Sequence, residues 1–242
     1  MKDTQTYYDD FSHNYDDARD GGYHAHIDAL ETGCVRRWLP GSRVLEVGCG
    51  TGLLLTRVRT FAPAAAGVDL SRGMLRRAVA RGHAVSQGSV LALPHRDRSF
   101  DLVYSFKVLP HVEQLDHGLA EVERVLDANG VALLEFYNPN SLRGLWKKVR
   151  WWKASVGKSS HDREVYTAYH TPEAARAAVA RHLDVVGACG VVLLTPIPLA
   201  HKVPVVGAVL RALERALCHG PLARLAGFYV VVARKRGAAS AR

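Results

Sequence analysis

The most constraining feature of the sequence is a glycine-rich turn at residues 48–52, which read Gly-Cys-Gly-Thr-Gly. The turn follows a short apolar run at residues 43–47, and residues 53–60 can continue as a helix. Residues without a Cβ atom let a ligand approach the backbone closely, and the first turn of a helix directs amide N–H groups at that ligand. The spacing differs from the Gly-x-Gly-x-x-Gly of dinucleotide-binding folds, and it lacks the Gly-Lys-Ser/Thr of a phosphate-binding loop. The turn therefore predicts another kind of ligand site between a strand and a helix.

An acidic residue, Asp69, lies near the end of the next apolar run, 17 residues after Gly52. In a strand–helix–strand unit this position lies at the carboxyl end of the second strand, beside the glycine-rich turn. A carboxylate there can accept hydrogen bonds from both hydroxyl groups of an adenosine ribose. Each feature by itself is also typical of a surface turn or a helix N-cap. Together they predict an adenosine-type ligand at the open end of a sheet.

Apolar runs alternate with helical patterns along most of the chain. Strands are expected at residues 43–47, 66–70, 83–86, 100–105, 131–136, 183–194 and 228–233, and helices at 24–38, 53–60, 71–79, 115–126 and from 171 onward. Ser71 and Thr171 are suitable N-caps, and Asn129-Gly130 suits a left-handed cap after the helix at 115–126. This alternation predicts an α/β fold with a mostly parallel sheet covered by helices on both faces.

Composition and cysteine spacing exclude several classes of protein. No stretch reaches the roughly 18 consecutive apolar residues that a membrane span needs, and the N-terminus does not resemble a signal peptide. The four cysteines, Cys34, Cys49, Cys189 and Cys218, form no Cys-x-x-Cys pair, so neither a metal site nor a disulfide framework is expected. The cytoplasm is the expected compartment.

Positive charge is concentrated in the C-terminal part of the chain. The formal net charge is +9, and residues 141–242 carry 17 Lys and Arg against 5 Asp and Glu. This asymmetry favours an anionic partner, namely a membrane surface, a nucleic acid or an acidic substrate. A solvated basic face without a partner has the same composition, so the charge by itself leaves these alternatives open.

Residues 141–153 have the pattern of an amphipathic helix. Apolar side chains at positions 142, 145, 146, 149 and 152 share one face, and Lys and Arg complement it. Trp beside Lys and Arg is typical of a helix at a membrane interface, whereas a helix that packs on the sheet and covers the substrate has the same spacing. A second amphipathic stretch covers residues 203–217. The sequence thus predicts either peripheral membrane contact through residues 141–153 or a lid over the substrate.

Five motifs, in order, resemble those of class I S-adenosylmethionine-dependent methyltransferases. They are Val-Leu-Glu-Val-Gly-Cys-Gly-Thr-Gly at 44–52, Gly-Val-Asp-Leu-Ser-Arg-Gly-Met-Leu at 67–75, Gly-Ser-Val-Leu-Ala-Leu-Pro at 88–94, Ser-Phe-Asp-Leu-Val at 99–103 and Glu-Arg-Val-Leu-Asp-Ala-Asn-Gly at 123–130. The resemblance covers about residues 5–140 and favours the small-molecule branch with ubiquinone and menaquinone biosynthesis enzymes. It implies one domain with a Rossmann-like, seven-stranded sheet. This domain would have a helical N-terminal lid at 1–40, a cofactor-binding core at 41–140, and a variable substrate region with the last strands at 141–242.

The resemblance also implies which residues bind S-adenosylmethionine. Its methionine part would lie on the glycine-rich turn, which contributes Gly48, Cys49, Gly50 and Gly52, with Glu46 acting through water. Its ribose would be held by Asp69, and its adenine would be surrounded by Leu70, Met74, Ser89 and Val90. The N-terminal lid would add Tyr15, and the reaction site would lie near Ser105, Phe106 and Lys107. Ser89 stands where the family usually has Asp, which implies weaker recognition of the adenine amino group.

Methyl transfer from a sulfonium needs alignment of the reacting atoms and exclusion of water, and a base only where the acceptor must lose a proton. His111 is the best-placed candidate base, although a lone histidine is also typical of a packing residue. Further candidates are His161, Tyr166 and His170. We therefore predict methyl transfer to a lipophilic or aromatic small molecule, at a membrane surface if residues 141–153 are interfacial.

Two other functions stay open at this point. A nucleic-acid methyltransferase would use the basic C-terminal part, but no RNA-binding module is recognisable, and Asn138-Pro139-Asn140 is not a base-methylation motif. A steep salt dependence of RNA binding would favour this alternative. A non-enzymatic cofactor-binding subunit is the other alternative, and the intact glycine-rich turn with Asp69 argues against it.

Overall fold

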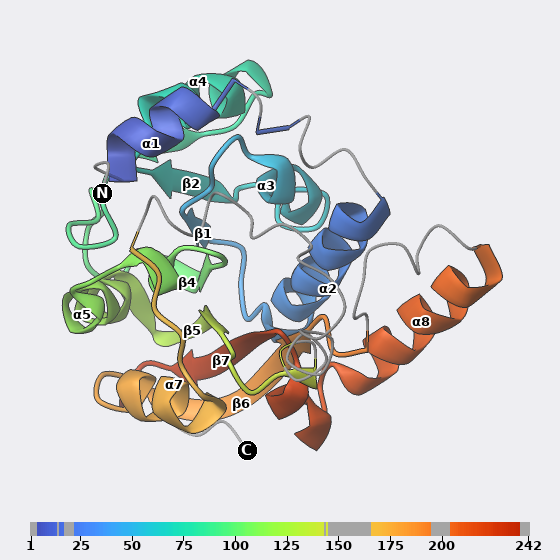
Figure 1. Cartoon of the computed structure of the whole chain (residues 1–242). Coiled ribbons are helices and arrows are strands. Elements are labelled where there is room, and N and C mark those ends of the chain that lie inside the picture. Colours follow the sequence, from blue (N-terminus) through green and yellow to red (C-terminus); the bar gives the residue numbers. More distant parts are fainter. Residues whose placement is uncertain are drawn as a thin grey trace.

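The computed structural model describes residues 4–13, 15–16, 22–142, 144, 166–194 and 204–237. Seven strands form one sheet in the order β3-β2-β1-β4-β5-β7-β6 (Figure 1). They are β1 (Val44–Val47), β2 (Ala66–Asp69), β3 (Val85–Gln87), β4 (Phe100–Ser105), β5 (Leu126–Tyr137), β6 (Asp184–Val191) and β7 (Phe228–Arg234). β7 runs antiparallel to both of its neighbours, and the other pairs are parallel. The predicted seven-stranded, mostly parallel sheet is therefore confirmed.

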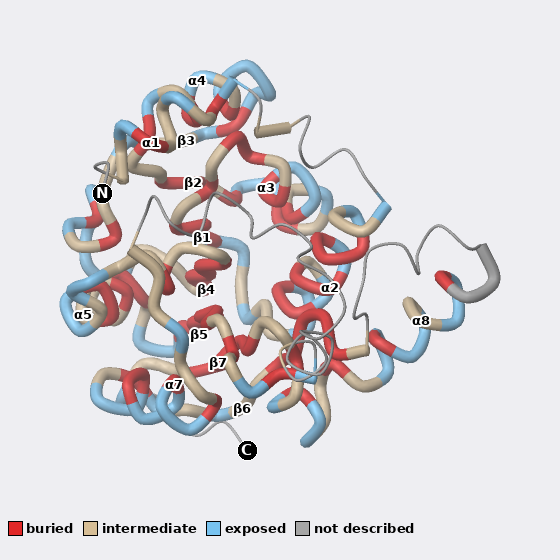
Figure 2. The backbone as a smooth tube through the Cα atoms, in the orientation of Figure 1, coloured by how far each residue is buried: buried red, intermediate tan, exposed pale blue. Residues whose placement is uncertain are grey.

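Helices cover both faces of the sheet. α2 (Gly22–Trp38) and α3 (Leu53–Val58) pack on one face, and α5 (Leu115–Val125) and α7 (Pro172–Val179) pack on the other. Successive residues of β5 alternate between the two cores, so that Leu133 joins the first and Leu134 the second, each fully buried. The central strands of the sheet are accordingly buried along much of their length (Figure 2). Because both faces are covered, the strands read as continuous apolar runs in the sequence.

The remaining helices lie at the ends of the sheet. α1 (Thr4–Phe11) lies against α4 (Arg72–Ala80), and α8 (Pro204–Leu217) extends away from the sheet (Figure 1). Short 3-10 helices occupy Leu109–His111 (η2) and Pro221–Leu225 (η6). Both predicted N-caps are confirmed, because Ser71 accepts a hydrogen bond from Met74 N and Thr171 accepts one from Ala174 N. Within the described residues no helix is both long and apolar enough to cross a membrane.

The predicted left-handed cap at Asn129-Gly130 is wrong, although α5 ends within one residue of its predicted end. α5 ends at Val125, β5 begins at Leu126, and Gly130 has no left-handed backbone conformation. Leu126 pairs with Phe100, and the carbonyl of Gly130 accepts a hydrogen bond from Lys235 N (3.2 Å). Strand pairing satisfies the backbone groups that a cap would have satisfied, so no left-handed residue is needed. Most of the predicted helix at 141–153, and the candidate His161, lie outside the described residues.

Candidate active site

A cavity of about 680 Å³ opens at the carboxyl ends of β1, β2 and β4. Its volume is typical of sites that bind small molecules. The cavity is lined by most of the residues predicted to contact a cofactor, namely Tyr15, Glu46, Gly48, Cys49, Gly50, Asp69, Leu70, Met74, Ser89, Val90 and Phe106. Lys107, which was predicted to lie near the reaction site, lines the same cavity, and so do the candidate bases His111 and Tyr166. Residues far apart in the sequence thus converge on one space, as the motifs predicted.

The glycine-rich turn has a shape that depends on glycine. Its three glycines have positive φ, between 53° and 80°. The N–H groups of Gly48 and Cys49 donate to the carbonyl of Val68 (2.7 and 3.0 Å) and so join the turn to β2. A Cβ on Gly48 would overlap Cγ2 of Val108, whereas a Cβ on Gly50 would have no described atom within 4 Å. The turn is therefore packed closely at Gly48 and open to the cavity at Gly50.

Asp69 connects the turn to the following helix. Its Oδ2 accepts a hydrogen bond from Gly50 N, and its Oδ1 accepts one from Ser71 N, both at 2.8 Å. Burial raises the pKa of Asp69, and the hydrogen bonds from Ser71 and Gly50 oppose this rise. Because a carboxylate oxygen can accept two hydrogen bonds, each oxygen keeps a lone pair for a ligand hydroxyl. The geometry fits the predicted contact with a ribose.

Three buried carboxylates meet around the end of β4. Glu31, Glu46 and Glu135 are 0%, 5% and 0% exposed. Lys107 pairs through its ammonium with Glu31, and its backbone N–H donates to Glu135 (3.0 Å). Lys107 has φ 62°, a conformation that costs about 1–3 kcal/mol outside glycine and persists only where its surroundings hold it. Glu31, Glu46 and Lys107 line the cavity. The cluster therefore places acidic side chains and a lysine of fixed conformation at the cavity wall.

The titration of Glu46 can be tested through protein stability. Tyr104 OH donates to Glu46 Oε2 (2.9 Å), and burial raises the pKa of Glu46 from 4.5 to about 8. Between these two values the folded chain holds a proton that the unfolded chain has released, so stability falls as pH rises. Glu46→Gln keeps an acceptor for Tyr104 but cannot titrate. We expect the free energy of unfolding of the parent to fall, relative to the variant, between about pH 4.5 and about pH 8 in urea titrations. A difference that does not change with pH would contradict the raised pKa.

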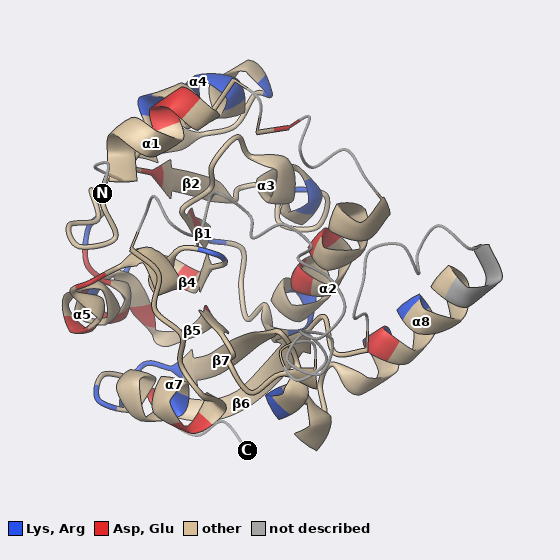
Figure 3. Cartoon of the chain, viewed as in Figure 1, with Lys and Arg blue, Asp and Glu red and all other residues tan. Residues whose placement is uncertain are grey.

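The N-terminal segment is fixed over the cavity by charged contacts. Ser71 Oγ donates to Asp9 (2.5 Å), and Thr51 Oγ1 donates to Asp16 (2.7 Å), which also pairs with Arg81 (2.6 Å). On α1, Asp9 also interacts electrostatically with Arg72 and Arg76 of α4, and Figure 3 shows acidic positions of α1 beside basic positions of α4. The aromatic side chains of this segment line the cavity, namely Tyr7, Tyr8, Phe11 and Tyr15. These contacts agree with the predicted role of a lid that excludes water.

Two predicted cofactor contacts lie outside the residues that line the cavity. Ser105 is fully buried, and its Oγ donates to the carbonyl of Val47 (3.1 Å), so it joins β4 to β1 beneath the turn. Gly52 starts α3 and packs against His83. Ser89 does line the cavity, and its Oγ already accepts a hydrogen bond from Leu91 N (3.1 Å). Its hydroxyl proton remains for donation to a ligand.

His111 is held in one tautomer. Its Nδ1 lies 2.8 Å from the carbonyl oxygen of Tyr166, and because a carbonyl can only accept, Nδ1 carries the proton. In the neutral ring Nε2 is then the acceptor nitrogen, and it lies 3.4 Å from Tyr137 OH. A histidine with one nitrogen fixed as donor and the other available as acceptor can act as a general base. His170, by contrast, is not among the residues that line the cavity, and its ring contacts Phe136.

The parallel sheet, the glycine-rich turn and Asp69 at its open end define an α/β domain that binds a nucleoside cofactor. Residues 45–134 match the family model described as a methyltransferase domain. Malonyl-[acyl-carrier protein] O-methyltransferase of Geobacter sulfurreducens is 34% identical over 147 residues, which are 58% of this chain and 54% of the relative. Demethylmenaquinone methyltransferase of Renibacterium salmoninarum is 35% identical over 128 residues, or 46% and 53% of the two chains.

A solved structure has the same fold. The S-adenosylmethionine-dependent methyltransferase of Thermotoga maritima aligns with a TM-score of 0.67 over 96% of this chain and 100% of that chain, at 18% identity. Residues 45–134 therefore form a methyltransferase domain, as the motifs of this segment predicted, and the chain is similar to methyltransferases that use S-adenosylmethionine. It spans about half the length of the two curated relatives.

Replacement of Asp69 tests the cofactor site directly. We expect Asp69→Ala to weaken binding of S-adenosylmethionine by about 1–3 kcal/mol, because charge-assisted hydrogen bonds to the ribose are lost. Isothermal titration calorimetry measures this change. Asp116→Ala is the matched control, because Asp116 is an exposed acid at the start of α5. An affinity of Asp69→Ala equal to that of the parent would refute the ribose contact.

Proposed function

We propose that this protein transfers the methyl group of S-adenosylmethionine to a lipophilic or aromatic small molecule, and that His111 takes up a proton from the acceptor. One observation carries the proposal: His111 and the glycine-rich turn line the same cavity. Cofactor and acceptor would therefore share one cavity, as direct transfer between them requires.

The residues of the cavity divide into two groups by their chemistry. On the cofactor side, Asp69 would hold the ribose, and the carboxyl oxygens of Glu31 and Glu46 would accept hydrogen bonds from an amino group. Gly50 leaves free the volume that a Cβ would fill. When bound, S-adenosylmethionine supplies a methyl group on a sulfonium that is activated for in-line displacement. His111 Nε2 would accept the proton that an acidic acceptor loses, and the N-terminal lid would exclude water.

The acceptor side of the proposal rests on aromatic and apolar lining. Tyr137 and Tyr166 line the cavity beside His111, together with Leu91 and Val112. A site of this composition favours an acceptor with apolar or ring character over a highly charged one. The relative named for demethylmenaquinone, a quinone, supports the same class.

The test is transfer of labelled methyl groups. Purified protein with labelled S-adenosylmethionine would be offered demethylated quinols, alkylphenols and free fatty acids, with total RNA as the comparison. We expect extractable labelled product with a quinol or a phenol. Label that enters RNA and no small molecule would contradict the proposal and favour a nucleic-acid methyltransferase.

Membrane contact through residues 141–153 stays a prediction. The structure adds an apolar feature elsewhere in the C-terminal part, because α8 exposes Val209 and Leu213, which lie one helical turn apart. If the helix at 141–153 is interfacial, Trp146→Ala/Trp152→Ala should reduce co-sedimentation with anionic phospholipid vesicles. Trp151→Ala is the matched control, because position 151 lies off the apolar face. Equal sedimentation of the double variant and the parent would refute membrane contact.

A further inference from the structure

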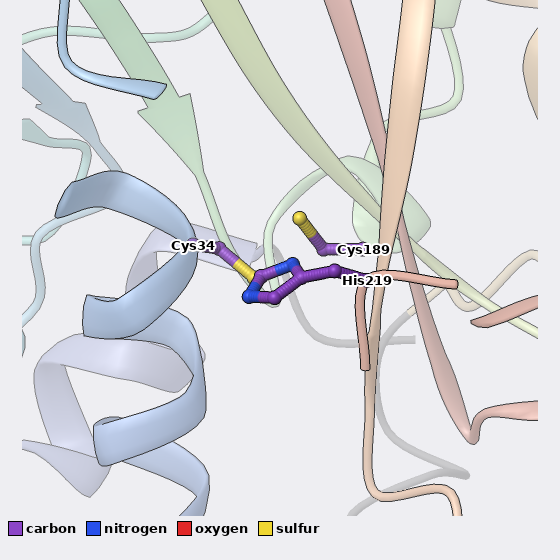
Figure 4. Close-up of side chains that lie close together, drawn as sticks. All are labelled: Cys34, Cys189 and His219. Atoms are coloured by element: carbon purple, nitrogen blue, oxygen red, sulfur yellow. The ribbon is translucent and has the colours of Figure 1, made fainter. Parts of the chain in front are cut away.

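Two buried cysteines and a half-buried histidine, from three separate segments, meet at the edge of the apolar core. Cys34 lies on α2, Cys189 lies on β6, and His219 follows the end of α8 (Figure 4). Their ligand atoms, two Sγ atoms and one ring nitrogen, all lie within 4.8 Å of one another. Both cysteines are free thiols and 0% exposed. The three side chains form a compact donor set outside the cavity described above.

The cluster has a donor atom for which the described residues provide no partner. Nδ1 of His219 is buried and makes no hydrogen bond to any described residue. A buried polar atom without a partner costs stability, and such an atom in a native fold calls for an explanation, for example a bound ion. The adjacent thiol of Cys218 points elsewhere, because it donates to the carbonyl of Arg215 (3.3 Å). A ligand that binds sulfur and nitrogen would satisfy His219.

We propose that Cys34, Cys189 and His219 bind a zinc ion. Two thiolates and one imidazole form a donor set that zinc prefers. With Zn–S bonds of about 2.3 Å and Zn–N bonds of about 2.0–2.1 Å, tetrahedral ligand atoms lie about 3.5–3.8 Å apart. Side-chain shifts of about 1 Å therefore suffice to close the site from its present spread. Binding would release the two thiol protons and leave the fourth position to a water molecule.

The ion would connect parts of the chain that the sequence keeps far apart. It would link α2 in the N-terminal part to the edge strand β6 and to the segment after α8. Because both cysteines are buried and the three ligands come from separate segments, the role of the ion would be structural: metal binding would stabilise the attachment of the C-terminal region to the sheet. The ligands are separated by 155 and 30 residues, so the sequence contains no short cysteine motif that would predict the site.

Metal content tests the site independently of methyl transfer. Untagged protein, purified under reducing conditions and loaded with zinc chloride, would be analysed by mass spectrometry of the metal after gel filtration. We expect about one equivalent of zinc per chain, and loss of most of it in Cys34→Ser/Cys189→Ser and in His219→Gln. Cys49→Ser should keep it, because Cys49 lies at the glycine-rich turn. Circular dichroism would show that each variant is folded.

A second measurement uses the parent protein alone, so its outcome does not depend on whether the variants fold. Zinc chloride added to chelator-treated parent should raise its Tm, whereas magnesium chloride should not, because sulfur and nitrogen donors select zinc. Two results would overturn the proposal. One is a reduced, folded parent that takes up no zinc; the other is a double variant that binds as much zinc as the parent.

Discussion

His111→Gln is expected to lower kcat for methyl transfer by about 10²–10⁴-fold, the usual contribution of a positioned general base. The reason is geometric. The carbonyl of Tyr166 holds the proton on Nδ1, so Nε2 is presented in the basic form without a change of tautomer. Glutamine fills similar space but cannot take up the proton. Single-turnover transfer of labelled methyl to the best acceptor of the panel measures the loss, and calorimetry with S-adenosylhomocysteine should show unchanged affinity.

Two further variants make this prediction specific. His117→Gln removes an exposed histidine of α5 and should leave kcat as in the parent. Tyr137→Phe removes the hydroxyl near Nε2 and should cause a smaller loss than His111→Gln. Parent-like turnover of His111→Gln would show that the acceptor needs no base and that His111 is a packing residue. Loss of S-adenosylhomocysteine binding in that variant would instead indicate that His111 supports the shape of the cavity.

The cofactor side of the site was predictable because its residues are close in sequence. The turn at 48–52 and Asp69 belong to one strand–helix–strand unit, whose geometry places them side by side whatever the rest of the chain does. Glycine at the turn and the acid at the strand end each carry a local physical reason. The same argument failed for Ser105, because position along a strand does not show whether a side chain faces the cavity or the neighbouring strand.

The residues that sequence reasoning missed are brought together by long-range packing. Glu31 lies on the buried face of α2, between Leu30 and Cys34, and approaches Lys107 only because α2 crosses the end of β4. An acidic residue on the apolar face of a helix could have indicated a functional residue from the sequence alone. Tyr137 and the Cys34–Cys189–His219 cluster gave no such signal. The left-handed cap at Asn129-Gly130 was mispredicted for a related reason, because strand pairing that begins at Leu126 overrode a local cap preference.

Gly48→Ala should be among the most destabilising single-methyl additions in the core. Two costs act together. The positive φ of Gly48, 79°, strains any residue with a Cβ, at about 1–3 kcal/mol, and overlap of the new methyl with Val108 adds overpacking of about 1–3 kcal/mol. Because Gly48 N donates to Val68, a shift of the turn would also disturb its connection to β2. Urea denaturation measures the fall in the free energy of unfolding.

Comparison with Gly50→Ala separates the steric cost from the conformational one. Gly50 also has positive φ, 53°, but no described atom lies within 4 Å of a Cβ built there, so we expect strain without overlap. Val108→Ala in the Gly48→Ala background should recover the stability lost to overpacking, whereas the cost of backbone strain at position 48 should remain. The added methyl of Gly50→Ala would enter the cavity. We therefore expect this variant to lose more free energy of S-adenosylmethionine binding than free energy of unfolding. Equal destabilisation by the two alanines, with no recovery from Val108→Ala, would show that Val108 does not constrain the turn, and the close packing at Gly48 would then need another explanation.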